Sequence, residues 1–339
     1  MFIQTRLKMK KISLLLSLFI LVSCAHESSE ELTIYTSRQP QLLEPIIETF
    51  YQETGIKVNL LSGNAQELME RIVIEGDESK ADLFMTVDAG VLWQAAERDI
   101  FAEIDSDILK NNIPEYLRDS NNLWFGLSKR ARTIVYSSDQ FSDSDFSTYE
   151  DLADSKWQGK LCLRTSKKVY NRSLMASMID AYGFDQAKKI VSGWVSNLAT
   201  EVFSNDTNAL KAVSSGQCGV TIVNTYYLAR LLDDAKYNNL NLFWANQNDR
   251  GVHVNISGAG IVKTTKNKTN AIKLLEYLSS EDAQDFYASA NKEYPILKGA
   301  LVHDAIRDWG EFSEDEINVS KLGSLQKEAV FLAQEVGYK

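Results

Sequence analysis

The chain has 339 residues, of which 44% are hydrophobic, and a formal net charge of −10 at pH 7. This length suits one large or two medium globular domains. The acidic balance, with no basic stripe, argues against a nucleic-acid-binding protein. Four prolines and 17 glycines form no low-complexity segment, and no repeat of solenoid or propeller period is found.

The N-terminal segment has the pattern of a targeting signal. Basic residues between Arg6 and Lys11 precede an apolar run over residues 12–22, which is too short to span a bilayer as a stable helix. The run ends in Leu21-Val22-Ser23-Cys24, which resembles the lipobox of bacterial lipoproteins. We predict a lipoprotein signal peptide over residues 1–23, a lipid on Cys24 and a polar tether over residues 24–31. The lipid would hold the protein at a membrane of the cell envelope, facing the periplasm or the exterior. An ordinary secretory signal with a chance cysteine is the alternative.

Two cysteines, Cys162 and Cys218, remain once Cys24 is assigned to lipid. Outside the cytoplasm an isolated pair can form a disulfide. Each lies in or beside a strand-like run, so neighbouring strands could bring the two together. Two free buried thiols are the alternative, because the sequence does not give the distance. No CxxC pair or Cys/His cluster indicates a zinc site.

The first part of the mature chain alternates between strand and helix patterns. Runs rich in β-branched and apolar residues predict strands, and apolar residues spaced for one buried face predict helices. These segments are a strand at 32–35, a helix around 42–51 that Gly55 ends, a strand at 56–61, a helix at 65–75 and a strand at 81–86. Short links between them predict βαβ units and a mainly parallel sheet.

The middle and the end of the chain repeat this alternation. Ser147 to Glu150 is a capping-box pattern that opens a short helix. The other predicted segments are strands at 128–136, 161–163, 219–223 and 255–262, helices at 171–182, 185–198 and 228–232, and a mostly helical tail from residue 270. No long flexible linker separates the halves, so we expect the chain to cross more than once between two α/β lobes with a cleft between them. The expected lobes are 32–130 with 262–305, and 131–261 with 306–339.

The paired tyrosines Tyr226 and Tyr227 lie where a predicted strand meets a predicted helix, a place where α/β folds commonly bind ligands. A phenol has a pKa of about 10 and is a poor ligand for most ions at neutral pH. A trivalent cation can displace the proton, and hard oxygen donors suit Fe³⁺. The alternative is one core tyrosine beside one surface tyrosine.

Several segments carry a resemblance to known proteins. The segments 50–58, 147–161, 278–284 and 291–295 resemble the corresponding parts of bacterial extracellular solute-binding proteins. Within that group, Val169-Tyr170-Asn171 and Asn224-Thr225-Tyr226-Tyr227 resemble the ferric-iron-binding proteins of iron ABC transporters. The resemblance covers nearly the whole mature chain.

This resemblance implies a type II periplasmic-binding-protein fold: two lobes with mixed, mainly parallel sheets flanked by helices, a hinge and a central cleft. It implies a carrier without catalysis, most simply a monomer, that captures Fe³⁺ and delivers it to a membrane permease and its ATPase. Carried over residue by residue, Tyr226 and Tyr227 match the paired tyrosine ligands, and Tyr170 matches the third tyrosine of one branch of the family.

The first lobe departs from the family pattern. Gln39 and Pro40 stand where many relatives have His or His-Tyr, and Val87, next to Asp88, stands where some have an acidic ligand. Glutamine offers only neutral donors and acceptors, so we expect no strong anionic ligand from this lobe.

A bound anion such as carbonate would fill the coordination positions left open. Alternation along a strand places Arg130 and Arg132 on one face, and a guanidinium fork matches a planar oxyanion. We expect Thr165 and Ser166 to add donors and Gln39 to close on the anion from the first lobe. Solvated surface charge, or an ion pair with a carboxylate, is the alternative for the arginines.

Two other functions compete with an iron carrier. A secreted hydrolase of the Ser/His/Asp type needs a histidine, but His26 lies in the tether, and His253 and His303 have no nucleophile motif to pair with. A two-carboxylate glycosidase needs no local motif, yet no acidic pair is singled out. A receptor for a small organic solute or an oxyanion would keep the same fold.

Overall fold

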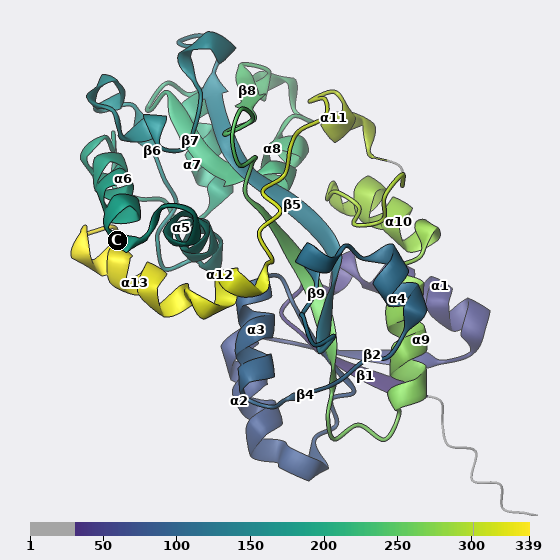
Figure 1. Ribbon diagram of the computed structural model, residues 1–339. Coiled ribbons are helices and arrows are strands. Elements are labelled where there is room, and N and C mark those ends of the chain that lie inside the picture. The colour runs from purple at the N-terminus through teal and green to yellow at the C-terminus, as the bar shows by residue number, and fades with distance from the viewer. Residues whose placement is uncertain (1–30, 301) are drawn as a thin grey trace, which may run out of the picture. The chain divides into compact units, whose positions relative to one another are not determined.

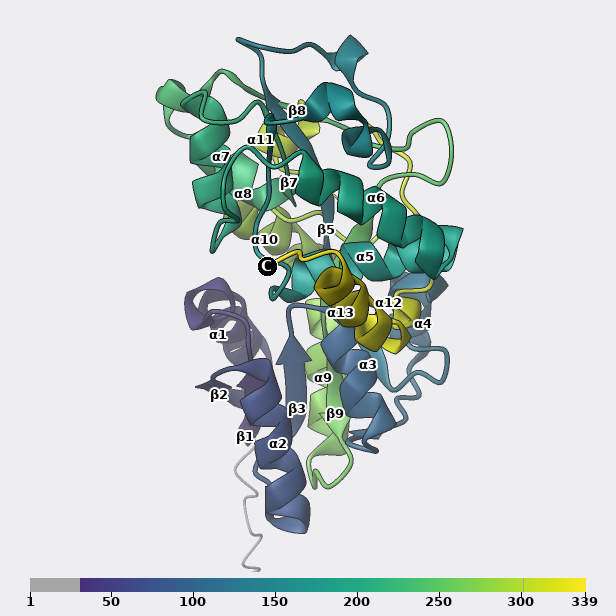
Figure 2. The same ribbon diagram turned by 90° about the vertical axis from the view of Figure 1, so that its left-hand side faces the viewer.

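The computed structural model describes residues 31–300 and 302–339, and Figures 1 and 2 show it from two sides. The predicted signal peptide and Cys24 lie outside these residues. The strands are β1 Glu31–Thr36, β2 Lys57–Ser62, β3 Leu83–Thr86, β4 Phe101–Ala102, β5 Trp124–Ser137, β6 Leu161–Cys162, β7 Val220–Asn224, β8 Leu240–Phe243 and β9 Val254–Val262. The α-helices are α1 Glu44–Thr54, α2 Ala65–Glu75, α3 Ala89–Glu97, α4 Asp107–Asn112, α5 Val169–Tyr182, α6 Phe184–Ser196, α7 Asp206–Ser214, α8 Thr225–Leu231, α9 Lys268–Leu278, α10 Glu281–Asn291, α11 Asp304–Arg307, α12 Ser320–Ser324 and α13 Gln326–Glu335.

The long strand β5 belongs to two sheets (Figure 1). Its first half, up to Ala131, pairs with β9, which continues through β3 and β1 to β2. From Arg132 onward it pairs with β7 and β8, and β6 lies beyond β7. We call the first sheet and its helices the first lobe, and the second sheet and its helices the second lobe. The predicted α/β architecture with two mixed sheets is confirmed.

Two details of the sheets differ from the sequence-based expectation. Parallel pairing joins β1 to β2 and β3, and β6 to β7, whereas β5 and β9 run antiparallel to their neighbours. The sheets therefore contain more antiparallel pairing than predicted. The sequence predicts that residues up to 261 belong to the second lobe, but β9 pairs with β3, β4 and the first half of β5, all in the first sheet. The other lobe boundaries stay a prediction.

Local chemistry explains where the helices near the lobe boundary begin and end. The Asn64 side chain accepts the backbone N–H groups of the first turn of α2, and Asp88 does the same for Gly90 in α3. Helix α1 ends at Gly55, whose φ of 73° is a left-handed conformation that glycine adopts readily. These caps fix the ends of the helices that follow the first-lobe strands.

The last two helices contact both lobes. Figures 1 and 2 show α12 and α13 lying along α5, with α12 next to α3. Gly323 lies against Trp93 of α3, so closely that an added Cβ would be 2.3 Å from the Trp93 Cβ. Gln326 Nε2 donates to Ser173 Oγ of α5 at 3.2 Å, and Ser173 Oγ donates to Asp88 Oδ2 at 3.0 Å. This buried chain of contacts connects the lobes beside the cavity described next.

Cys162 and Cys218 form a disulfide with a Cα–Cα distance of 5.9 Å. Cys162 ends β6, and Cys218 precedes β7, the strand that leads to the paired tyrosines. The bond therefore joins the two strands at the edge of the second sheet.

Candidate functional site

A cavity of about 310 Å³ lies between residues of the two lobes. The first lobe supplies residues that follow its strands and α10, including Arg38, Gln39, Val87 and Glu293. The second lobe supplies residues from the segment before α5 and from α5 and α8: Arg164, Lys168, Tyr170, Tyr226, Tyr227 and Arg230. Arg130, on the strand shared by both sheets, also lines it.

The three tyrosines singled out in the sequence come together on this cavity. Tyr170 lies in the first turn of α5, and Tyr226 and Tyr227 lie in the first turn of α8. The rings of Tyr226 and Tyr227 are 4.4 Å apart between centroids, and the hydroxyls of Tyr226 and Tyr170 lie close enough for each to shift the pKa of the other. Asn224 Nδ2 donates to the Tyr226 hydroxyl at 3.2 Å. Two helix starts thus place three phenol oxygens at one wall.

Two of these phenols hold their protons at neutral pH. Burial, followed by repulsion from Tyr227, raises the pKa of Tyr170 to about 12, although Arg130 opposes the shift. Burial, followed by repulsion from Tyr170 and Tyr227, raises the pKa of Tyr226 well above its ordinary value. An ion must therefore displace protons to bind these oxygens.

The other charges on the cavity are mainly positive. The lining residues include Arg38, Arg130, Arg164, Lys168 and Arg230, against the single carboxylate of Glu293. The Arg130 and Arg164 guanidinium carbons each lie 5.4 Å from the centre of the Tyr170 ring, and Lys168 Nζ lies 5.1 Å from it. With Tyr170 and Tyr226 neutral, the wall has an excess of positive charge and suits an anion.

Arg130 has an unused donor. Its Nη2 donates to the Val87 carbonyl and lies 3.8 Å from Asp88 Oδ2. Its buried Nη1 has no hydrogen-bond partner among the described residues. A buried donor left unpaired costs about 1–3 kcal/mol, so an acceptor bound in the cavity would remove that cost.

A buried ion pair at the first-lobe wall was not foreseen. Arg38 Nη2 lies 2.7 Å from Glu293 Oε2, and Ser128 Oγ donates to the same oxygen at 2.6 Å. Burial alone would raise the pKa of Glu293, but Arg38, Ser128 and Arg130 together outweigh it and hold that pKa below its usual value. Glu293 is thus a carboxylate already neutralised by Arg38. The sequence offered two signals for these residues. Arg38 lies beside Gln39, and Glu293 lies in the segment 291–295, which carries the family resemblance.

The structure corrects the expected position of Arg132. Its guanidinium is buried against Asp206 at 2.9 Å and does not line the 310 Å³ cavity. Alternation does place Arg132 beside Arg130, since both line a small hollow with Tyr170. The donors of Arg132, however, are taken up by Asp206 and by two asparagine side chains. For Arg132, the alternative of an ion pair with a carboxylate is the one observed.

Thr165 and Ser166 also lie away from the cavity lining. The Thr165 hydroxyl donates to the Lys339 carbonyl at 3.1 Å, and the Ser166 hydroxyl donates to the Tyr338 carbonyl at 2.7 Å. These side chains hold the segment 338–339, while Arg164 and Lys168 on either side of them line the cavity. The sequence does contain a signal for these two residues, because basic side chains recur in the segment that precedes α5.

A family model for bacterial extracellular solute-binding proteins matches residues 35–285. The chain belongs to this family. Its members bind solutes and are not enzymes, so the expected absence of catalysis agrees with the family. The cavity between the lobes is therefore the candidate solute site of this solute-binding protein.

This solute-binding protein is similar to named relatives and to proteins of solved structure. It is 44% identical over 316 residues to iron uptake protein A1 of Synechocystis, covering 91% of this chain and 88% of that one. It is 44% identical, with a TM-score of 0.88, to the Trichodesmium protein IdiA (FutA) in complex with iron and citrate, covering 91% of this chain and 100% of that one. The ferric binding protein from Campylobacter jejuni is 35% identical with a TM-score of 0.85, over 91% of this chain and 100% of that one.

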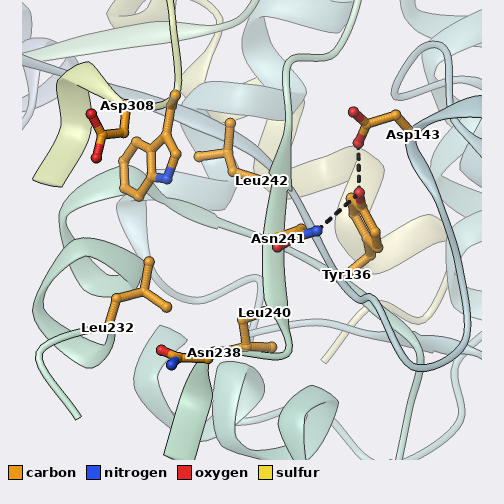
Figure 3. Close-up of a pocket in the computed structure, with 9 residues that line it drawn as sticks. Tyr136, Asp143, Leu232, Asn238, Leu240, Asn241, Leu242 and Asp308 are labelled. Atoms are coloured by element: carbon orange, nitrogen blue, oxygen red, sulfur yellow. Dashed lines mark hydrogen bonds between the residues drawn. The ribbon is translucent and has the colours of Figure 1, made fainter. Parts of the chain in front are cut away.

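A second hollow of this solute-binding protein, about 450 Å³, lies beside β8 (Figure 3). The Tyr136 hydroxyl there donates to Asp143 Oδ1 at 2.5 Å and accepts from Asn241 Nδ2 at 3.5 Å. Leu232, Leu240 and Leu242 line another part of it. Its phenol is already paired with a carboxylate, so it lacks the convergent unpaired donors of the cavity between the lobes.

Two further findings concern residues 31–300 and 302–339. Within these ranges, His, Cys, Asp and Glu side chains form no group of three or more that could hold a metal ion. In the same ranges, no helix has the length and apolar character needed to cross a membrane.

Proposed function

We propose that this protein captures Fe³⁺ in the cavity between its lobes, with the phenolate oxygens of Tyr170, Tyr226 and Tyr227 as ligands. The observation that carries the proposal is the convergence of these three hydroxyls on one wall of a 310 Å³ cavity. Hard anionic oxygens match a hard trivalent ion, and three phenolates neutralise its charge. Relatives named for iron uptake and ferric iron binding support this reading.

The phenols also suit a protein that binds Fe³⁺ and later releases it. Their raised pKa values keep Tyr170 and Tyr226 neutral in the empty protein, so mutual repulsion between phenolates does not destabilise the iron-free lobe. A trivalent ion lowers the pKa of its ligands enough to release the protons. Loading and proton release are then one coupled step.

An anion completes the site in this proposal. Arg130 contributes its unpartnered Nη1, and Lys168 and Arg164 add positive charge from the second lobe. Gln39 lines the first-lobe side and offers a neutral amide. Carbonate or a carboxylate anion has the charge and planar oxygens that these donors match. A solved relative contains both iron and citrate, which supports an anion of this class.

The carrier would work at the cell envelope. Family membership implies a partner permease and its ATPase, to which the loaded protein delivers iron. The lipobox-like Leu21-Val22-Ser23-Cys24 would anchor a monomer to the membrane through Cys24. Both the anchor and the delivery step belong to the proposal.

Colour and metal content of the purified domain, residues 31–339, test the proposal. The apo protein is titrated with Fe³⁺ in bicarbonate, in citrate and in buffer without either. We expect one iron per chain, a visible phenolate-to-iron charge-transfer band, and tighter binding when an anion is present. A colourless protein without iron under all three conditions would overturn the proposal. An organic solute or oxyanion receptor would then be favoured by the excess of basic residues on the cavity.

A further inference from the structure

The buried ion pair of Arg132 and Asp206 lies close to Tyr170 and Tyr226. Arg132 Nη1 lies 2.9 Å from Asp206 Oδ2, and Nη2 lies 3.3 Å from Asp206 Oδ1. Both side chains are almost completely buried. Removing two charges from water is costly, and an apolar pair of similar volume is often at least as stable. The ion pair therefore needs a reason beyond stability.

The remaining donors of Arg132 reach two asparagines, each beside a tyrosine. Nε donates to Asn171 Oδ1 at 3.0 Å, and Asn171 is the neighbour of Tyr170 in α5. Nη1 also donates to Asn224 Oδ1 at 3.0 Å. Asn224 Nδ2 in turn donates to the Tyr226 hydroxyl at 3.2 Å. One guanidinium thus spans the starts of α5 and α8.

The same network fixes the segment that precedes α5. Asn171 Nδ2 donates to the carbonyls of Arg164 and Thr165 at 2.8 and 3.2 Å and to the Tyr338 hydroxyl at 2.8 Å. The Tyr338 hydroxyl donates to the Arg164 carbonyl at 2.6 Å. Asp206 lies 3.7 Å from Arg164 Nη1. The cations of the cavity and Tyr170 therefore rest on the same support.

We propose that Arg132 is a positioning residue that holds Tyr170 and Tyr226 at a fixed separation by bridging Asn171 and Asn224. The inference rests on the proposed iron site, because it explains how that site is preorganised. Only an arginine can make this bridge, because its nitrogens bond in separate directions to Asn171, Asn224, Asp206 and the Ile222 carbonyl. A lysine ammonium keeps the charge but presents its donors from one point and cannot span both asparagines.

Arg132→Lys tests the proposal, with Arg250→Lys as the matched control. Arg250 is another largely buried arginine, paired with Asp315 at 2.6 Å, and its side chain contacts neither Asn171 nor Asn224 in any described hydrogen bond. Both variants are made in the domain, residues 31–339, and titrated with Fe³⁺ in bicarbonate. We expect Arg132→Lys to weaken iron binding by about 10–100-fold, the range for outer-shell partners of a metal site, and to shift the charge-transfer maximum. Arg250→Lys should leave both unchanged.

The outcomes separate this inference from the proposed function. The inference would be overturned, while the iron site stands, if Arg132→Lys bound Fe³⁺ with the affinity and the charge-transfer band of the natural protein. Equal losses in both variants, in proportion to their lowered stability, would also overturn it. If Arg132→Lys does not fold, the neutral pair Arg132→Gln with Asp206→Asn replaces it in the same titration.

Crystal structures of the iron-free variants give a readout that needs no iron. We expect the Tyr170 and Tyr226 hydroxyls to move apart in Arg132→Lys and to keep their places in Arg250→Lys. Unmoved hydroxyls in Arg132→Lys would overturn the inference even if the natural protein binds no iron.

Discussion

The phenol hydroxyl is the smallest unit on which the proposed function depends. Replacing tyrosine by phenylalanine removes one ionisable oxygen and keeps the ring that packs in the wall. At Tyr226 the change leaves Asn224 Nδ2 without its acceptor, which costs about 1–3 kcal/mol. A folded protein with an altered site is therefore expected.

Single Tyr→Phe substitutions at Tyr170, Tyr226 and Tyr227 should each weaken Fe³⁺ binding by more than about 100-fold, beyond the usual effect of outer-shell partners. The charge-transfer band should bleach at Tyr226 and Tyr227 and weaken or shift at Tyr170. Iron competition against a coloured chelator and visible spectroscopy measure both effects. Tyr136→Phe is the control, because Tyr136 is hydrogen-bonded to Asp143 outside this cavity. Full colour and affinity in Tyr170→Phe would refute a three-tyrosine site.

The raised pKa values of Tyr170, to about 12, and of Tyr226 set the direction of the pH dependence. Both are protonated in the iron-free protein at neutral pH and deprotonated in the loaded one. Affinity should therefore rise with pH and fall as pH falls, by up to about a thousandfold per unit if three phenols release protons. Chelator competition between pH 5.5 and 8 measures the slope, and Tyr227→Phe should reduce it. A slope near zero would contradict phenolate ligation.

At the scale of elements, the strand β7 carries the site, because it leads directly into the turn that presents Tyr226 and Tyr227. Its neighbour β6 is attached to it both by pairing and by the Cys162–Cys218 bond. The bridge thus reinforces the edge of the second sheet, at the end of β7 away from the tyrosines.

Removing the bridge by Cys162→Ser with Cys218→Ser should lower the free energy of unfolding by about 4 kcal/mol. This magnitude follows from the entropy of closing a loop of sequence separation 56. Urea denaturation measures the change, and iron stoichiometry should stay at one because the tyrosines are not touched. Thiol labelling of the denatured, unreduced natural domain is the direct check. Two labelled thiols in that sample would show that the bridge does not form.

At the scale of the whole molecule, the working arrangement is a cavity whose wall comes from both lobes and a chain that crosses between the lobes in β5. Arg130 lies one residue before Ala131, the last residue of β5 paired with β9, and contacts Val87 of the first lobe and the Tyr170 ring of the second. The binding of an anion at Arg130 would therefore depend on the distance between the lobes.

The full-length protein expressed in a bacterial host should reach the membrane fraction with a diacylated N-terminal Cys24. Mass spectrometry of the N-terminal peptide detects the lipid. A Cys24→Ala variant should instead stay uncleaved or appear without the lipid mass. An unmodified protein cleaved at another residue would refute the lipobox assignment and leave the cavity and its ligands unaffected.

The family, the three tyrosines and many of the helices and strands could be predicted from the amino-acid sequence. Local patterns sufficed for these, since helix and strand periodicity and a strand-to-helix turn depend on neighbouring residues. By contrast, α3, α4, α7 and β8 lie outside the predicted segments. The predicted helices at 65–75 and 171–182 agree with α2 and α5 to within a few residues. The pairs Tyr-Asn and Tyr-Tyr pointed to the cavity wall because each tyrosine lies at the start of its helix.

Which charges face the cavity is settled by the folded chain alone. Arg130 and Arg132 look equivalent in the sequence and share a small hollow, yet Arg130 also lines the cavity between the lobes, whereas Arg132 is held by Asp206. Arg38 and Glu293 meet across a sequence separation of 255 residues, which no local pattern reports. Burial and long-range pairing set the role of a charged side chain, and both are properties of the tertiary structure.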